Sequence, residues 1–118
     1  MPPEGYHSVT PRIVVEDPEA TFAFLQAVFD AEGEVRPGQP IEARIGDSLI
    51  MVSGVAERSL FPAFLYVYVD DADTRYAKAI AEGAVSIEAP MNTPYGDRRG
   101  MVQDPAGNVF QIAHRLPG

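Results

Sequence analysis

A glutamine interrupts the apolar run Val109-Phe110-Gln111-Ile112-Ala113 near the end of the chain. An amide both donates and accepts hydrogen bonds, so Gln111 could coordinate a metal ion, contact a ligand, or have no functional role. It cannot act as the proton-shuttling group of an enzyme, because an amide does not titrate near neutral pH. What Gln111 can do therefore depends on the side chains that share its surface.

Aromatic and aliphatic residues alternate along 64–68, which is typical of a β-strand. Phe64, Tyr66 and Tyr68 would then project from one side of that strand. The two tyrosine rings could stack on a planar ligand, and they could equally pack in a dimer interface. The sequence leaves these two roles open.

Three arginines, Arg12, Arg44 and Arg98, fall in predicted strands and could each bind a carboxylate or a phosphate through paired donors. Glu42 and Asp97 are close enough in sequence to neutralise some of them in a purely structural network. The complete set of candidate ligand-binding residues is Arg12, Glu42, Arg44, Met51, Phe64, Tyr66, Tyr68, Arg98 and Gln111.

Other polar residues have simpler interpretations. His7 lies in a segment with glycine and proline nearby and is expected at the surface or in a dimer contact. His114 is expected to cap a helix or to face solvent. The acidic run at 70–73 is expected to cap a helix rather than bind calcium, because it lacks the glycine and distal glutamate of a calcium loop.

The elements that would position these residues occur twice in the same order. A β-branched run leads into an acidic residue and a helix at 14–17 and again at 67–71, and strands follow each helix. This pattern predicts an α+β fold in which two β-α-β-β-β modules form a curled mixed sheet around a cleft. Module one would cover about 8–54 and module two about 62–115, within a single domain of residues 1–118.

Capping residues indicate where the two helices begin and end. The first helix is expected to begin after Asp17 and to be followed by Gly33. The second is expected to begin near Asp71 or Asp73 and to stop at Gly83.

Two hairpins predict which residues share a sheet face. The turn Gly46-Asp47 would pair Glu42 with Met51 and Arg44 with Leu49. A four-residue turn at 104–107 would place Arg98, Gly100 and Val102 on the same face as Val109 and Gln111. A sheet face of such mixed aromatic and charged composition predicts a ligand cavity or an oligomer interface.

Charge and composition exclude several classes of partner. The 118 residues carry 17 acidic and 9 basic side chains, a net charge of −8, which argues against binding to nucleic acid or to anionic membrane surfaces. The acidic charge slightly favours a flat, partly cationic ligand. No membrane-spanning run or export signal is recognisable and cysteine is absent, so a cytoplasmic protein is expected.

The motifs TPRIVVEDPEATFAFLQAVF, ARIGDSLIMV, YGDR and VQDPAGNVFQIA resemble the glyoxalase/bleomycin-resistance/dioxygenase, or vicinal-oxygen-chelate, superfamily over nearly the whole chain. Within it they are similar to the small single-domain branch that includes antibiotic-resistance homologues. The resemblance implies two modules around a cleft, and it commonly implies a homodimer.

Metal-dependent members of that superfamily take histidine, glutamate or glutamine ligands from the first and last strand of each module. The matching positions here are Thr10, Met51, Phe64 and Gln111. Only the Gln111 amide oxygen is a plausible donor to a divalent cation, so neither a metal nor another cofactor is expected.

The resemblance therefore implies a metal-free small-molecule-binding protein, of the kind that sequesters drugs or toxins. One alternative is a metal-dependent lyase, isomerase or dioxygenase with an unusual ligand set that includes Gln111, Glu42 and His7. Another is an interaction domain whose aromatic face is used in dimerisation.

Overall fold

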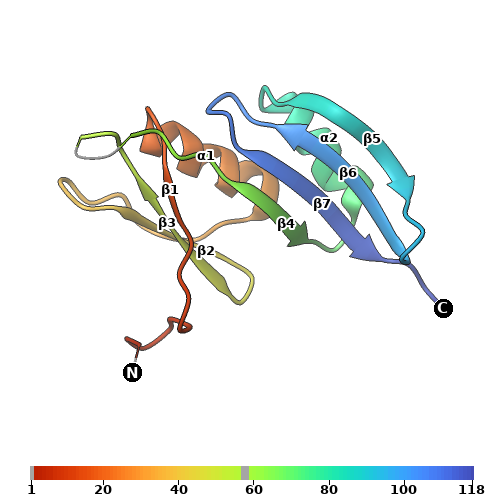
Figure 1. The fold of residues 1–118 in the computed structure, drawn as a ribbon, viewed down its shortest axis with the longest axis horizontal. Helices are drawn as coiled ribbons and strands as arrows, with labels where there is room; N and C mark the ends of the chain where they lie inside the picture. Colours follow the sequence, from red (N-terminus) through yellow and green to blue (C-terminus); the bar gives the residue numbers. More distant parts are fainter. Residues whose placement is uncertain (1, 57–58) are drawn as a thin grey trace. The chain divides into compact units, whose positions relative to one another are not determined.

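The computed structural model describes residues 2–56 and 59–118. Its contacts divide the chain into two compact units, Met1–Pro62 and Ala63–Gly118. The described part of each unit contains one helix and one mixed sheet, so the predicted α+β class is confirmed (Figure 1). The boundary at 62–63 lies close to the predicted start of module two; whether both units belong to one domain stays a prediction.

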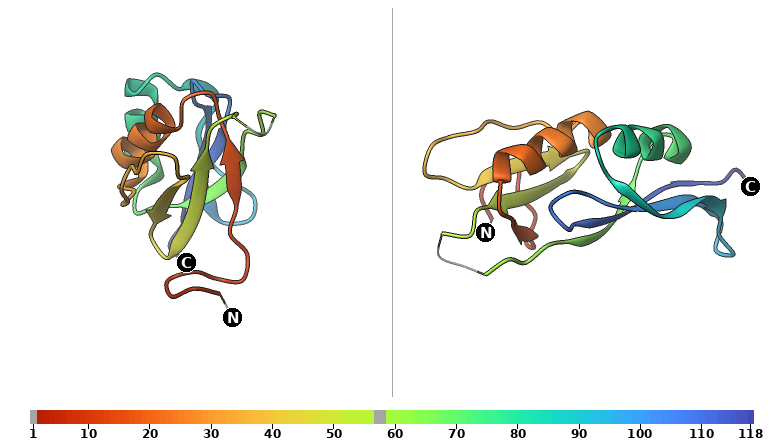
Figure 2. Two further views of the ribbon diagram at one scale, coloured as in Figure 1. Left: turned by 90° about the vertical axis from the view of Figure 1, so that its left-hand side faces the viewer. Right: turned by 90° about the horizontal axis from the view of Figure 1, so that it is seen from above.

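Unit 1 has the order β1 (Arg12–Val14), α1 (Pro18–Phe29), β2 (Ile41–Ile45) and β3 (Ser48–Ser53). Strand β3 is central, with β1 parallel on one side and β2 antiparallel on the other. Helix α1 covers one face of this sheet, as Figure 2 shows. It begins as predicted, because the Asp17 carboxylate accepts a hydrogen bond of 3.1 Å from the Ala20 N–H and Pro18 is the first helical residue.

The end of α1 differs from the prediction. Asp30, not Gly33, takes the left-handed conformation that ends the helix, with a φ of 58°. Gly33 has another role, because a Cβ there would overlap the carbonyl oxygen of Glu42. Gly33 therefore lets the backbone after the helix approach β2 closely.

Among its described residues, unit 1 also has one strand fewer than the predicted β-α-β-β-β pattern. Between α1 and β2, Glu32 pairs with Arg44 as an isolated bridge, through reciprocal backbone hydrogen bonds of 2.9 and 2.8 Å. Proline lacks an N–H donor, so Pro37 and Pro40 in the following loop disfavour further backbone pairing with β2.

Unit 2 has the order β4 (Phe64–Tyr68), α2 (Ala72–Ala81), β5 (Val85–Asn92), β6 (Asp97–Gln103) and β7 (Val109–Arg115). The strands lie in the order β4-β7-β6-β5, and α2 packs on one face of this sheet, mainly against β6. Asp71 caps α2 as predicted, and His114 Nδ1 accepts a hydrogen bond of 2.8 Å from the Ala72 N–H. The expected capping role of His114 is thus confirmed.

The last hairpin contains one more loop residue than predicted, and this reverses a face assignment. Gln103 pairs with Val109, so Asn108 belongs to the loop. The Asn108 side chain is held there by two hydrogen bonds of 2.8 Å: its Nδ2 donates to Asp104 Oδ2, and its Oδ1 accepts from the Ala63 N–H. A shift of one residue moves a whole strand to the other face. The prediction that Arg98, Gly100 and Val102 share a face with Gln111 is therefore wrong.

The apolar core of each unit lies between its helix and its sheet. In unit 1 the buried residues include Phe22, Leu25 and Val28 of α1, and in unit 2 they include Phe110 and Ile112 of β7. Across the described ranges 2–56 and 59–118, none of the helices is long and apolar enough to span a membrane.

Candidate functional site

The face of the unit 2 sheet that points away from α2 carries three aromatic side chains. We call it the aromatic face, and it comprises Phe64, Tyr66, Tyr68, Met101 and Gln111. The rings remain accessible, with exposed fractions of 70% for Phe64, 36% for Tyr66 and 59% for Tyr68. In unit 2 the structure thus brings together four of the predicted ligand-binding residues, with Met101 added.

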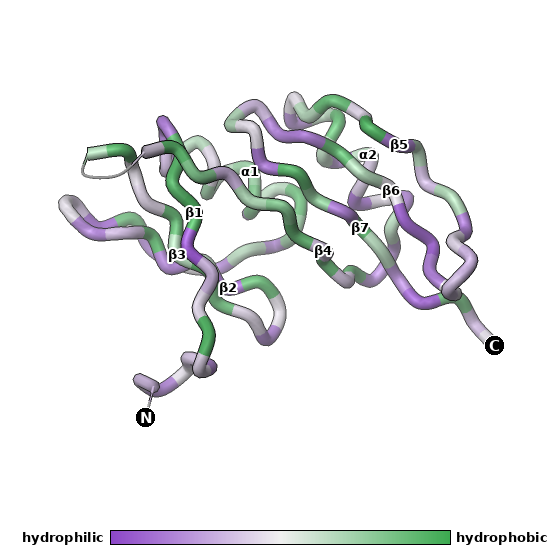
Figure 3. Tube along the Cα trace, viewed as in Figure 1, coloured by the Kyte–Doolittle hydropathy of each residue, from purple (hydrophilic) through white to green (hydrophobic). Residues whose placement is uncertain are grey.

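Gln111 lies in the middle of the aromatic face. Its register partners are Tyr66 on β4 and Met101 on β6, and its side chain is half-buried. Figure 3 shows the hydrophilic colour that interrupts the hydrophobic part of β7. Within the part of the chain that the structure describes, no hydrogen bond occupies the Gln111 amide. This amide can therefore bond to a ligand without breaking an internal contact.

Both tyrosines of the aromatic face are anchored by one carboxylate. The hydroxyl groups of Tyr66 and Tyr68 donate hydrogen bonds of 2.6 and 2.9 Å to Asp97 Oδ2. Their ring centroids lie 5.3 Å apart, with planes inclined at 54°. Because each ring is fixed at its hydroxyl end, the two rings form a defined surface rather than two independent side chains.

Asp97 itself is inaccessible to solvent and is stabilised as a carboxylate. Arg115 Nη1 lies 2.8 Å from its Oδ1. The hydrogen bond from Tyr66, followed by those from Tyr68 and Arg115, holds the pKa of Asp97 below its usual value. Burial and the bond to Asp97 raise the pKa of Tyr66, and the same carboxylate raises that of Tyr68. Both hydroxyls therefore remain protonated donors at neutral pH.

Arg98, a predicted site residue, does not reach the aromatic face. It projects toward α2, where its Nε lies 3.0 Å from Asp73 Oδ1. Its neighbour Arg99 takes the position on the aromatic face that was expected for Arg98, and it pairs with Glu88 at 3.0 Å. Arg99 was missed because the extra loop residue Asn108 could not be recognised from the turn motif alone.

The predicted face of unit 1 forms as expected. Arg12, Met51 and Glu42 are register partners across β1, β3 and β2, and Arg44 pairs with Leu49. The sequence left open whether Glu42 and Asp97 neutralise some of the three arginines; within the described residues, neither forms an ion pair with Arg12, Arg44 or Arg98. Arg12 Nε donates to Ser53 Oγ at 2.9 Å, and Arg44 Nη2 donates to the carbonyl oxygen of Gly5 at 3.2 Å.

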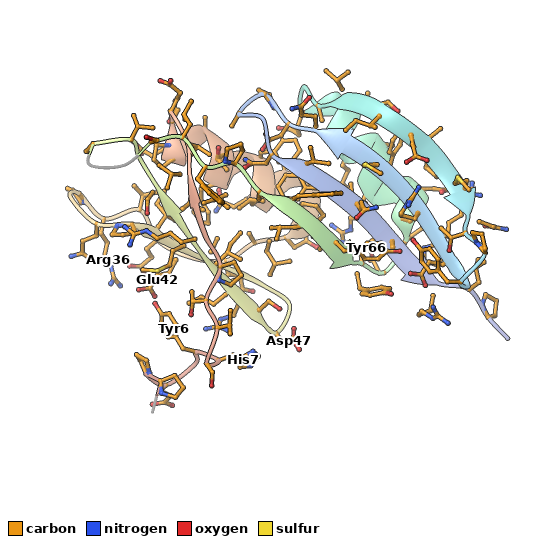
Figure 4. The ribbon with its side chains drawn as sticks, viewed as in Figure 1. Tyr6, His7, Arg36, Glu42, Asp47 and Tyr66 are labelled. Atoms are coloured by element: carbon orange, nitrogen blue, oxygen red, sulfur yellow. The ribbon has the colours of Figure 1, made fainter. Side chains whose placement is uncertain are left out.

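A cavity of about 320 Å³ lies beside this face in unit 1. Its lining includes Glu32, Glu34, Arg36, Glu42, Arg44 and Leu49. Figure 4 shows Tyr6 extending from the N-terminal segment toward Glu42, with Arg36 on the same side. The hydrogen bond from Tyr6 to the Glu42 carboxylate raises the pKa of the Tyr6 hydroxyl.

The four positions that correspond to metal ligands do not fit a divalent cation. Thr10 and Met51 lie in unit 1, and Phe64 and Gln111 in unit 2. Phenylalanine has no donor atom, and thioether and hydroxyl groups are poor ligands for hard or borderline cations. In the described ranges, no three histidine, cysteine, aspartate or glutamate side chains are grouped so that they could hold a metal ion.

Known proteins resemble this chain in sequence. Residues 6–112 match the Glyoxalase/Bleomycin resistance protein/Dioxygenase superfamily. The chain is 31% identical, over 114 residues and 90% of its own length, to a protein named "Putative glyoxylase CFP32" from Mycobacterium bovis. The aligned part makes up 43% of that relative, so the chain spans less than half of the relative's length.

Solved structures resemble it in fold. TioX from Micromonospora sp. ML1 aligns with a TM-score of 0.78 at 20% identity, covering 93% of this chain and 99% of TioX. A glyoxalase/bleomycin resistance protein/dioxygenase family enzyme from Burkholderia phytofirmans PsJN aligns with a TM-score of 0.75 at 29% identity, covering 89% and 95%. Because the sequence match extends over residues 6–112, the chain belongs to the Glyoxalase/Bleomycin resistance protein/Dioxygenase superfamily.

Proposed function

We propose that this chain is a small-molecule-binding protein that uses the aromatic face to hold a planar ligand and so sequesters it. The observation that carries the proposal is the free Gln111 amide, which lies beside two tyrosine rings anchored by Asp97. Flat rings offer a stacking surface, and one unoccupied amide can fix the orientation of a ligand. Neither feature requires a metal ion.

The ligand that suits this face best is flat and partly cationic. A net charge of −8 attracts cations at long range, and tyrosine rings favour a positive charge above them. Arg98, which would have favoured an anion, is paired with Asp73 on the other face. Arg99 is present on the aromatic face, but Glu88 balances its charge.

A thermal-shift screen with planar heteroaromatic cations, basic glycopeptides, carboxylates and phosphates tests the class of ligand. The flat cation proflavine serves as the probe for affinity. Gln111→Ala should weaken its binding by about 1–2 kcal/mol, the usual loss when a hydrogen-bond partner is removed, while the melting temperature stays nearly unchanged. Stabilisation by the anions alone would refute the cationic ligand.

Gln103→Ala is the matched control, because Gln103 lies on the same face in the register row of Val109, away from the tyrosines. It should leave the affinity for proflavine unchanged. Equal losses in both variants would show that Gln111 does not orient the ligand. A Gln111→Ala protein that is unstable but still binds would make Gln111 a structural residue.

A metal-dependent lyase, isomerase or dioxygenase is the second candidate, and the name of the mycobacterial relative favours it. Elemental analysis separates the two. We expect protein purified without chelators to contain well under one equivalent of zinc, nickel, cobalt, manganese or iron, because three of the four matching positions lack a suitable donor. A stoichiometric metal that only strong chelators remove would favour the enzyme.

The proposal includes a cytoplasmic homodimer. Within unit 2, β5 is an edge strand that exposes Val85, Ile87 and Met91, and exposed apolar edges are commonly covered by a partner. Light scattering at micromolar concentration tests the assembly. A clean monomer would assign Tyr66 and Tyr68 to ligand contact alone.

A further inference from the structure

The lining of the cavity in unit 1 includes no residue of the aromatic face and has a different chemistry. Its volume of about 320 Å³ is at the lower end of the range for small-molecule sites. Five of its lining side chains are charged and Leu49 is apolar. A small, charged molecule would fit such a site better than a flat aromatic one.

The wall of the cavity is fixed to the sheet. Glu32 and Arg44 exchange backbone hydrogen bonds of 2.9 and 2.8 Å, which hold the loop after α1 against β2. Gly33 permits this approach, since any larger residue would collide with the carbonyl of Glu42. The cavity is therefore a feature of the fold rather than of an unattached loop.

The charges in the cavity are only partly balanced. Glu34 and Arg36 pair with each other at 3.2 Å. Glu32, Glu42 and Arg44 have no ion-pair partner in the described part of the chain, although Glu42 and Arg44 are two residues apart on one face of β2. The unbalanced groups are thus two carboxylates and one guanidinium.

Both central groups keep hydrogen-bonding capacity for a ligand. The Glu42 carboxylate accepts from Tyr6, and the Arg44 guanidinium donates to the Gly5 carbonyl. A carboxylate has about four lone-pair sites and a guanidinium has five donors, so most of their capacity remains unused. The N-terminal residues thereby hold Glu42 and Arg44 at one side of the cavity without neutralising either.

We propose that this cavity binds a small molecule with one carboxylate and two cationic groups, the charge pattern of a basic amino acid. Arg44 pairs with the ligand carboxylate in a bidentate manner. Glu42 and Glu32 each hold one cationic group, and Leu49 contacts the aliphatic part of the ligand. This site functions independently of the aromatic face.

Calorimetric titration of the full chain with L-arginine tests the proposal, with agmatine, which lacks the carboxylate, and L-glutamate, which carries the opposite charge pattern, as comparisons. L-Arginine should bind about tenfold more tightly than agmatine, as expected for one added charge-assisted contact. L-Glutamate should not bind. Equal affinity for L-arginine and agmatine would overturn the role of Arg44, and a lack of L-arginine binding would overturn the site.

Substitutions of single residues test which side chains of the cavity contact L-arginine. Arg44→Gln should lower the affinity for L-arginine about tenfold and leave that for agmatine unchanged, whereas Glu42→Gln should weaken both. Arg12→Gln is the matched control, because it removes the same charge from the same sheet face outside the cavity lining. If Arg12→Gln weakened L-arginine binding as much as Arg44→Gln, long-range charge would explain the binding and the proposal would fail. Proflavine affinity should be unchanged in all three variants, which separates this test from that of the aromatic face.

Discussion

Asp97 organises the aromatic face although its side chain is buried. Its carboxylate accepts hydrogen bonds from two tyrosine hydroxyls and from the Arg115 guanidinium. Its backbone N–H donates a hydrogen bond of 2.9 Å to Thr93 Oγ1. The Tyr66 hydroxyl has only one proton, and it donates this proton in its hydrogen bond to Asp97. Tyr95, 3.2 Å from the Tyr66 oxygen, must therefore act as the donor in that contact. One buried charge thus determines how the tyrosine rings are presented.

Removal of the Asp97 charge should change the response of stability to acid. Its pKa is lowered in the folded protein, chiefly by the bond from Tyr66. A carboxyl with a lowered pKa contributes stability that is fully present above its ordinary pKa and is lost as pH falls through the lower folded value. Urea unfolding of Asp97→Asn from about pH 6 to about pH 2 should therefore show a shallower loss of stability than the wild type.

The control for this experiment is Asp47→Asn, which alters an exposed carboxylate in the β2–β3 turn. It should reproduce the pH dependence of the wild type. Parallel pH profiles for Asp97→Asn and the wild type would mean that the buried carboxylate does not contribute to acid sensitivity.

Several site residues could be predicted from the sequence and others could not. Alternation along 64–68 placed the three aromatic residues correctly, because strand parity depends only on local sequence. The role of Asp97 depends on hydroxyl groups that reach it from β4, past the intervening strand β7, where Ala113 is small. Such a contact depends on strand order, which local patterns do not report.

At the scale of elements, helix starts were predictable and loops were not. Asp17 and Asp71 cap the helices as expected, because an N-cap is a local interaction between neighbouring residues. The face of β6 was assigned wrongly because Asn108 is held in the loop partly by the Ala63 N–H, a residue far away in sequence. The bridge between Glu32 and Arg44 is likewise a tertiary pairing that local sequence does not report.

Helix α2 packs closely on β6 where Tyr76 lies over Gly100. A Cβ on Gly100 would lie 2.8 Å from Cδ2 of Tyr76, and the Tyr76 hydroxyl donates a hydrogen bond to Ser86 Oγ. Because the ring is held at its far end, Gly100→Ala should destabilise the protein by about 1–3 kcal/mol, as overpacking usually does. Urea denaturation measures the change in the free energy of unfolding.

Gly54→Ala is the control for packing, since its Cβ would meet Pro18 at an ordinary 3.4 Å. It should change stability far less than Gly100→Ala. If both variants were as stable as the wild type, the contact between Gly100 and Tyr76 would be looser than the structure shows.

At the scale of the whole molecule, the superfamily was predictable because its motifs extend along most of the chain, and residues 6–112 match it. Function is less constrained, since members of one fold carry out different chemistry through their site residues. The sites proposed for this chain are an aromatic face in one unit and a charged cavity in the other. The net charge of −8 should attract cationic ligands to either, with association that slows as salt is added.

Binding of a planar ligand by the aromatic face can be tested directly by an NMR titration of the ¹⁵N-labelled chain with proflavine. Saturable shifts should concentrate in the amides of Phe64–Tyr68 and Val109–Arg115, the strands that carry the three rings and Gln111. The Asp97→Asn variant should show smaller shifts at the same positions, because its rings are less firmly held. Saturable shifts confined to other segments, or none at any concentration that keeps the protein folded, would contradict binding at the aromatic face.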